Sequence, residues 1–282
     1  MKRAAYLPLI ALVTFSACQN QANNSTTQTQ SKKDTNQFQV GIPPGNDTMK
    51  HEQTEFYTPV PAVVTPGKTN SEPPSDAVVL FDGKDLSNWV EANDTTKPAG
   101  WTVSNGTFTV KPGTGNIQTK QRFEDYQLHL EWREPVEDTT KHKGQDYGNS
   151  GLFLASLGKG DAGYELQILD SYHGETYSNG QAGSIYKQFP PLVNACRPPA
   201  EWQTYDVVWH APRFNADSSL KSPASITAFQ NGVLIQDHSV LKGVTLYIGH
   251  PYYLKHGPSP IKLQDHHHLV SYRNIWVRPL DK

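Results

Sequence analysis

Short stretches of alternating apolar and polar residues dominate the chain after residue 76, and helical periodicity is scarce there. In residues 126–133, Leu128, Leu130 and Trp132 fall on one face, and the opposite face is polar. A two-residue period of this kind is typical of a strand that buries one face. Similar short runs recur at 77–81, 101–103, 107–110, 151–155, 164–169, 202–209, 226–230, 233–237 and 270–277. So many short strands predict an all-β fold, an antiparallel β-sandwich or jelly roll.

Two pairs of these runs are separated by residues that favour tight turns. Asn105-Gly106 lies between one pair and Asn231-Gly232 lies between the other. Asn and Gly tolerate the positive backbone φ that a two-residue hairpin turn requires. Both pairs are therefore predicted to form antiparallel hairpins.

The first 18 residues are interpreted as a signal peptide rather than as part of the fold. A basic start at 1–3 precedes an apolar stretch at 4–15, which is too short to span a bilayer as a helix. Cys18 follows two small residues and resembles the cysteine of a bacterial lipoprotein box, which implies lipidation of Cys18. Because Gln19 follows Cys18, we predict that the lipid anchor lies in the outer membrane, with the protein facing the periplasm or the cell surface. The alternative is a plain signal peptide with a chance cysteine.

Residues 19–75 are predicted to form a tether. Gln, Asn, Ser, Thr and Lys make up nearly all of 19–37, and prolines recur through 38–75. Such segments bury too little apolar surface to offset the entropy lost on ordering. We therefore expect one folded domain over 76–282. Part of the tether, within 38–75, is expected to be extended and able to pack on this domain.

Composition and charge exclude some classes of function. The net charge is −2 and the isoelectric point is about 6.6, which argues against nucleic acid as a partner. Two cysteines cannot build a disulfide scaffold or a four-cysteine zinc site. With Cys18 lipidated, Cys196 is interpreted as a packing thiol.

Two strands carry conspicuous polar faces. In 164–170, Glu165 and Gln167 share one face while Leu166 and Ile168 take the other, and 126–133 carries a similar polar face. A solvent-facing sheet explains each strand alone. Together they also suit a concave sheet that grips a polyhydroxylated ligand.

Eight segments, in order and at matching spacing, resemble the bacterial 3-keto-disaccharide hydrolase family over about residues 77–280. They are Leu80–Lys84, Asn149–Phe153, Tyr164–Asp170, Gln181–Tyr186, Glu201–Tyr205, Asn231–Val233, Ile261–His266 and Tyr272–Ile275. The resemblance implies a concanavalin-like jelly roll related to laminarinases. One departure is local, because His267 and His268 follow His266 where the family commonly has a glycine.

The resemblance also implies activity on sugars whose C3 hydroxyl has been oxidised to a ketone. The ketone acidifies the proton on C2, a base removes it, the enolate expels the aglycone from C1, and water adds back. Such a site needs a base, a stabiliser for the enolate oxygen, and an acid for the leaving oxygen. The chain has no glycine-rich dinucleotide fingerprint, so a separate sugar oxidoreductase is expected to supply the substrate.

Glu165 and Asp170 are the first candidate catalytic residues. The run from Glu165 to Asp170 resembles the laminarinase catalytic strand, with Gln167 in place of its central acid. Retaining hydrolysis needs two carboxyl groups about 5–5.5 Å apart. The replacement of the central acid by Gln167 therefore weakens the interpretation of the protein as an ordinary endoglycosidase. One of the two acids is expected to serve as base and the other to position substrate or a metal. The alternative is that they are ordinary sheet-face and turn residues.

His266 is the third candidate catalytic residue, because an imidazole suits proton transfer near neutral pH. A polar surface loop at 266–268 is the alternative. A divalent metal, held by Glu165 or Asp170 together with His266, is left open as a cofactor.

Further side chains are candidates for binding the substrate. They are Asn149, Gln167, Tyr172, His173, Tyr186, Gln264, Asp265 and Arg273. Arg273 could equally form a structural ion pair, and Asn149 could merely form a turn. A non-catalytic carbohydrate-binding lipoprotein and an ordinary endoglycosidase remain the alternatives to the 3-keto-glycoside enzyme.

Overall fold

The computed structural model describes residues 50–138 and 140–280. The chain divides into two units, Met1–Val60 and Pro61–Lys282. Within the described ranges, no helix has the length and apolarity to cross a membrane.

The described part of the first unit contains a short 3-10 helix, η1 (His51–Thr54). The side chains of His51 and Glu55 are hydrogen-bonded beside it at 2.7 Å. The expected signal peptide and Cys18 lie outside the described residues, so lipidation stays a prediction.

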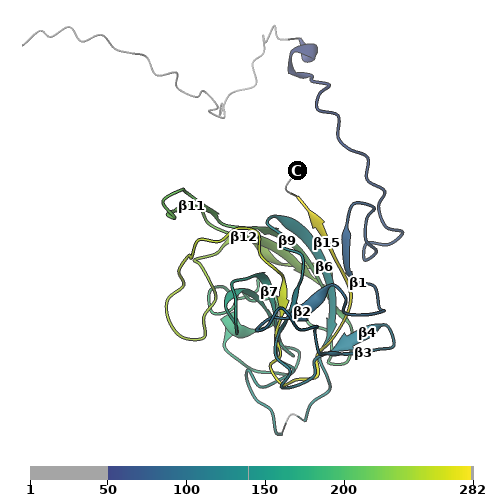
Figure 1. Cartoon of the computed structure of the whole chain (residues 1–282), viewed down its shortest axis with the longest axis vertical. Helices are drawn as coiled ribbons and strands as arrows, with labels where there is room; N and C mark the ends of the chain where they lie inside the picture. Colours follow the sequence, from purple (N-terminus) through teal and green to yellow (C-terminus); the bar gives the residue numbers. More distant parts are fainter. Residues whose placement is uncertain (1–49, 139, 281–282) are drawn as a thin grey trace, which may run out of the picture. The chain divides into compact units, whose positions relative to one another are not determined.

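The second unit is built on a large antiparallel sheet (Figure 1). Its strands are β1 (Val78–Phe81), β3 (Thr102–Ser104), β4 (Thr107–Thr109), β6 (Tyr126–Arg133), β9 (Gln203–His210), β12 (Ser225–Gln230), β13 (Val233–Val240) and β15 (Ser271–Pro279). The order is β13-β12-β9-β6-β15-β4-β3, and β1 also pairs with β15. β15 pairs with β6 along one edge, and its other edge pairs with β4 at Ser271 and Tyr272 and with β1 at residues 275–277.

A smaller antiparallel sheet has five strands. They are β2 (Trp89–Glu91), β5 (Ile117–Thr119), β7 (Ser150–Ser156), β8 (Gly163–Ile168) and β14 (Lys262–Leu263), in the order β2-β5-β14-β7-β8. A two-stranded ribbon, β10 (Arg213–Phe214) with β11 (Leu220–Ser222), and a 3-10 turn, η2 (Ser178–Gly180), complete the elements.

Alternation along the strands supplies the core from both sheets. Leu128, Leu130 and Trp132 of β6 are fully buried, as are Leu166 and Ile168 of β8. The two layers are therefore those of an antiparallel β-sandwich, and the predicted jelly roll is confirmed.

Tyrosine hydroxyls join the two layers across the core. Tyr126 donates to the Leu154 carbonyl at 2.6 Å, and Tyr205 donates to the Gln167 carbonyl at 2.7 Å. Buried hydroxyls need partners, so these bonds fix how the layers lie on each other.

Both predicted hairpins are confirmed. Asn105-Gly106 joins β3 to β4 and Asn231-Gly232 joins β12 to β13, with positive φ at all four residues.

The expectation that the polar faces of residues 126–133 and 164–170 share one concave sheet is wrong. β6 lies inside the large sheet, whereas β8 is the edge strand of the small one. Because each strand turns its apolar face to the common core, the two polar faces point away from each other, on opposite outer surfaces of the sandwich.

Part of the expected tether belongs to this unit. The backbone carbonyl of Ser71 accepts hydrogen bonds at 2.9 Å from the side chains of Asn274 and Trp276, both in β15. Asp76 pairs with Arg278 at 2.8 Å. The segment before β1 is thus held against the large sheet.

Candidate active site

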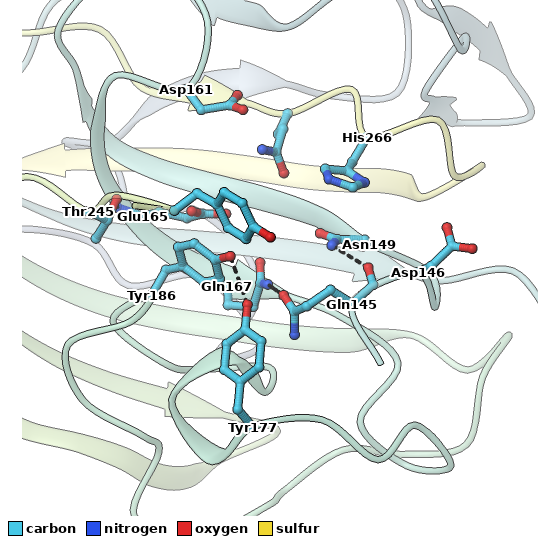
Figure 2. Close-up of a pocket in the computed structure, with 12 residues that line it drawn as sticks. Gln145, Asp146, Asn149, Asp161, Glu165, Gln167, Tyr177, Tyr186, Thr245 and His266 are labelled. Atoms are coloured by element: carbon cyan, nitrogen blue, oxygen red, sulfur yellow. Dashed lines mark hydrogen bonds between the residues drawn. The ribbon is translucent and has the colours of Figure 1, made fainter. Parts of the chain in front are cut away.

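A cavity of about 510 Å³ opens on the outer face of the small sheet (Figure 2). β8 places Glu165 and Gln167 in its floor, and the segment after β14 adds Gln264 and His266. Loops supply the rest of the wall: Gln145, Asp146, Asn149, Asp161, Tyr177, Tyr186, Thr245 and Tyr247. The cavity thus collects residues from five separate stretches of the chain.

Glu165 is the most unusual group in the cavity. Its residue is only 6% exposed, and its carboxylate makes no hydrogen bond with any described residue. Gly151 on the neighbouring strand β7 leaves the space for it, because a Cβ there would collide with Glu165 Oε1. A larger residue at Gly151 would therefore force the Glu165 carboxylate out of its present position.

Burial raises the pKa of Glu165 to about 8, and the nearby Asp161 carboxylate adds to the rise. The ammonium group of Lys262 acts in the opposite direction but does not cancel it. At neutral pH Glu165 is mostly an uncharged acid, so it can donate a proton inside the cavity.

Lys262 is wholly buried beside Glu165 and organises one wall. Its Nζ donates to three backbone carbonyls, of Gly158 at 2.8 Å, Gly160 at 2.7 Å and Ala162 at 3.1 Å. Burial lowers the pKa of Lys262 to about 8, although Asp161 and Glu165 raise it. This cage fixes the loop that presents Asp161 to the cavity.

Gln167 and Gln264 each hold a buried side-chain oxygen that has no hydrogen-bond partner in the described structure. Gln145 accepts from the amide of Gln167 at 2.8 Å, and its backbone carbonyl accepts from Asn149 at 2.6 Å. Unpaired buried acceptors are costly, and a ligand rich in hydroxyl groups would satisfy them.

Tyrosines form the aromatic side of the cavity. The hydroxyls of Tyr177 and Tyr186 lie 2.8 Å apart, as Figure 2 shows. Burial raises the pKa of both, so they stay protonated donors. Lys187 lies over the rings of Tyr177 and Tyr247, with Nζ 5.2 Å and 4.4 Å from the ring centres.

His266 reaches the cavity from the loop that follows β14. Burial lowers its pKa, and His268 lowers it further. The rings of His266 and His268 are stacked with centres 6.1 Å apart.

The structure brings together six of the predicted site residues: Asn149, Glu165, Gln167, Tyr186, Gln264 and His266. It does not bring Asp170 to them. Asp170 is fully buried and does not line the cavity, and its Oδ1 accepts from the backbone N–H groups of Tyr172 and His173 at 2.9 and 3.3 Å. A catalytic role for Asp170 therefore has no support from the geometry.

Four predicted binding residues also lie elsewhere. Tyr172 and His173 sit in the turn that Asp170 caps, and neither lines the cavity. Asp265 accepts from the backbone N–H of Gly115 at 2.9 Å, which makes it a loop anchor. Arg273 binds Glu131 at 2.6 Å on the large sheet, so the ion-pair alternative holds for it.

Other cavity residues carry no periodic signal in the sequence. Gln145, Asp146, Asp161, Tyr177, Thr245 and Tyr247 all come from connections between strands. Lys262, which does not line the cavity itself, had a usable signal, because it lies two residues before the predicted Gln264.

A cluster able to hold a metal exists, but it is not the expected one. Among the described residues, Glu137, His142 and His268 each place one ligand atom within 4.8 Å of the others. Glu165, Asp170 and His266 are not part of it.

The β-sandwich holds a cavity with a buried acid, unpaired amide oxygens and tyrosine hydroxyls, which is the kind of site that binds a small polar ligand. Residues 76–278 match the 3-keto-alpha-glucoside-1,2-lyase-like domain, and the chain belongs to this family.

Solved structures agree with this assignment. A protein of Parabacteroides distasonis ATCC 8503, provisionally described as a glycosyl hydrolase, is 47% identical with a TM-score of 0.76; the match covers 85% of this chain and 100% of that one. A second protein of that organism with the same description is 20% identical over 73% of this chain and 94% of its own, with a TM-score of 0.53, which supports the fold alone. No curated protein shows significant similarity to the chain.

Proposed function

We propose that the protein cleaves 3-keto-glycosides by elimination and rehydration. The observation that carries the proposal is Glu165, an acid kept uncharged by burial at neutral pH and facing a cavity lined with unsatisfied acceptors. Membership of the 3-keto-alpha-glucoside-1,2-lyase-like family supports the choice of a keto sugar as substrate.

The proposed steps use three parts of the cavity. His266 takes the proton from C2, and the electron pair forms an enolate with the C3 oxygen. The hydroxyls of Tyr177 and Tyr186 share one hydrogen bond, in which one O–H donates to the other oxygen. The second O–H is left to donate to the enolate oxygen. Glu165 protonates the aglycone oxygen as the C1–O bond breaks, and water then adds at C1 while a proton returns to C2.

Sugar hydroxyls are expected to bind the orphan oxygens of Gln167 and Gln264, and a sugar ring to stack on Tyr247. A carboxylate acting as nucleophile, which ordinary retaining hydrolysis needs, is less well supported because Gln167 stands beside Glu165 on the strand face.

The test compares aryl 3-keto-glucoside with its unoxidised parent, each incubated with the purified protein. We expect aryl alcohol release from the keto sugar only, and its loss in Glu165→Gln. Glu201→Gln, at an exposed position, is the matched control and should behave as wild type. Cleavage of the unoxidised parent would establish an ordinary glycosidase, and binding of either sugar without turnover would establish a carbohydrate-binding protein.

We propose that another protein supplies the substrate. A C3 ketone arises by two-electron oxidation of a sugar hydroxyl, and the chain lacks a glycine-rich dinucleotide fingerprint. We therefore place a sugar oxidoreductase immediately before this protein.

We also propose that the protein is a lipoprotein of the bacterial outer membrane, anchored through Cys18 and facing the periplasm or the cell surface. The arrangement of the basic start, the apolar stretch and Cys18 supports this. Fractionation of cells expressing wild type and Cys18→Ala tests it: the wild type should sediment with membranes and the variant should not. Equal membrane association of the two would refute the anchor.

A further inference from the structure

A second group of chemistry-bearing side chains lies next to the cavity. Glu137 and His142 come from the connection between β6 and β7, and His268 comes from the loop before β15. One ligand atom from each lies within 4.8 Å of the other two. Asp146 adds a carboxylate, with Oδ2 3.2 Å from His142 Nδ1 and Oδ1 3.1 Å from His268 Nε2.

The cluster is preorganised rather than a chance meeting of surface chains. His268 is 5% exposed, and its Nδ1 lies 2.6 Å from Glu137 Oε1. The other oxygen of Glu137 accepts from the backbone N–H of Gly148 at 2.7 Å. The contacts of Glu137 with His268 and Gly148 therefore hold these side chains in place within the cluster.

We propose that Glu137, His142, Asp146 and His268 form a binding site for one divalent transition metal. Imidazole nitrogens with carboxylate oxygens suit zinc-type ions, whereas calcium and magnesium prefer oxygen ligands alone. The four side chains offer two neutral donors and two negative charges, enough to neutralise the ion.

The site adjoins the proposed catalytic cavity without depending on it. Asp146 lines the cavity, and His266, which also lines it, stacks on His268. A metal here would fix the loop that carries Asp146 and the stack that carries His266. Metal binding is measured without substrate, so its outcome is separate from that of the proposed function.

The experiment is a calorimetric titration of Zn²⁺ into the purified protein after treatment with a chelator and dialysis. We expect saturable binding of one equivalent and a rise in the melting temperature with added Zn²⁺. His142→Gln and Asp146→Asn change partly exposed side chains and should keep the fold while weakening binding at least tenfold. His250→Gln, an exposed histidine outside the cluster, should leave binding unchanged.

The alternative outcome is an ion-pair network in which His268 bridges two carboxylates without metal. Absence of one-equivalent binding by the folded wild type would establish that network and overturn the site. Equal Zn²⁺ affinity in wild type, His142→Gln and Asp146→Asn would overturn it as well.

Discussion

The two outer faces of the sandwich both bury ionisable side chains, but they treat them oppositely. On the large sheet, His129 Nδ1 contacts Asp206 at 2.6 Å, and Glu131 accepts from Arg273 at 2.6 Å and Asn274 at 2.8 Å. On the small sheet, the carboxylate of Glu165 makes no hydrogen bond with a described residue, and the ammonium group of Lys262 donates only to backbone carbonyls among them.

The pKa values follow this difference. Burial alone would lower the pKa of His129 and raise that of Glu131, yet their partners raise the first to about 9 and lower the second to about 2. On the small sheet burial prevails, and the pKa values of Glu165 and Lys262 both move to about 8. The ion-paired groups on the large sheet stay charged and stabilise the fold, whereas Glu165 and Lys262 both titrate near pH 8, so that Glu165 is mostly uncharged at neutral pH and can exchange a proton.

The largest expected effect is on turnover when Glu165 is changed. Glu165→Gln keeps the size and the neutral form of the side chain but cannot donate a carboxylic proton. We expect turnover of the keto sugar to fall by about 10²–10⁴-fold, the usual contribution of a general acid. Rate measurements at saturating substrate check this, with melting curves to show that the fold is kept. Wild-type turnover in the variant would remove Glu165 from the chemistry.

The matching change on the large sheet should affect stability and not chemistry. Glu131→Gln removes the charge shared by His129, Arg273 and Asn274 in a side chain that is 9% exposed. Breaking a buried ion pair from one side costs about 3 kcal/mol. Urea unfolding at pH 6 should show this loss, while turnover per folded molecule stays that of wild type. Unchanged stability would show that this network contributes nothing to folding.

Lys262→Met is expected to affect both stability and turnover, because Lys262 is buried and also positions a wall of the cavity. The change leaves three carbonyls without their donor, and we expect a loss of ~2 kcal/mol in unfolding free energy. Freed from its cage, the loop with Asp161 should raise KM more than it lowers kcat. Lys159→Met on the exposed part of the same loop is the control. A variant with wild-type stability and KM would contradict the positioning role.

The smallest expected effect is a difference between the pH dependence of turnover, set on the small sheet, and that of stability, set on the large sheet. Glu165 acts as an acid only when protonated, so turnover should be insensitive to it below pH 8 and fall about tenfold per pH unit above that value. His129 has a raised pKa, so its stabilisation is complete below pH 6.5 and is lost as the pH rises through about 9. The melting temperature should therefore begin to fall near pH 6.5, while turnover stays constant until about pH 8. A fall of turnover that follows the melting temperature from pH 6.5 would mean that unfolding, and not the ionisation of Glu165, limits turnover at high pH.

Most of the fold was predictable because strands and hairpin turns are local signals. The alternation in β6 and the two Asn-Gly pairs fixed β-structure and turns correctly. The assignment of strands to sheets was not predictable from alternation, since β6 and β8 carry similar polar faces yet lie on opposite surfaces.

The site was predictable where a strand face or the family resemblance marked it. Glu165 and Gln167 followed from a strand face, and Asn149, Tyr186, Gln264 and His266 lie in the segments that carry the resemblance. Asp170 was misplaced because β8 ends at Ile168, after which the chain turns inward and the carboxylate caps the backbone. The cavity residues from loops, such as Asp161 and Tyr247, depend on tertiary contacts that leave no local pattern.

Cleavage through an enolate is tested most directly by letting the protein hydrolyse a 3-keto-glucoside in D2O. Elimination removes the C2 proton and returns one from solvent, so the 3-keto-glucose released should carry deuterium at C2, detected by mass spectrometry and NMR. Free 3-keto-glucose incubated with Glu165→Gln in the same buffer measures background exchange. If the product carried no more deuterium at C2 than this background exchange introduces, the mechanism would be contradicted, and direct displacement at C1 would be indicated.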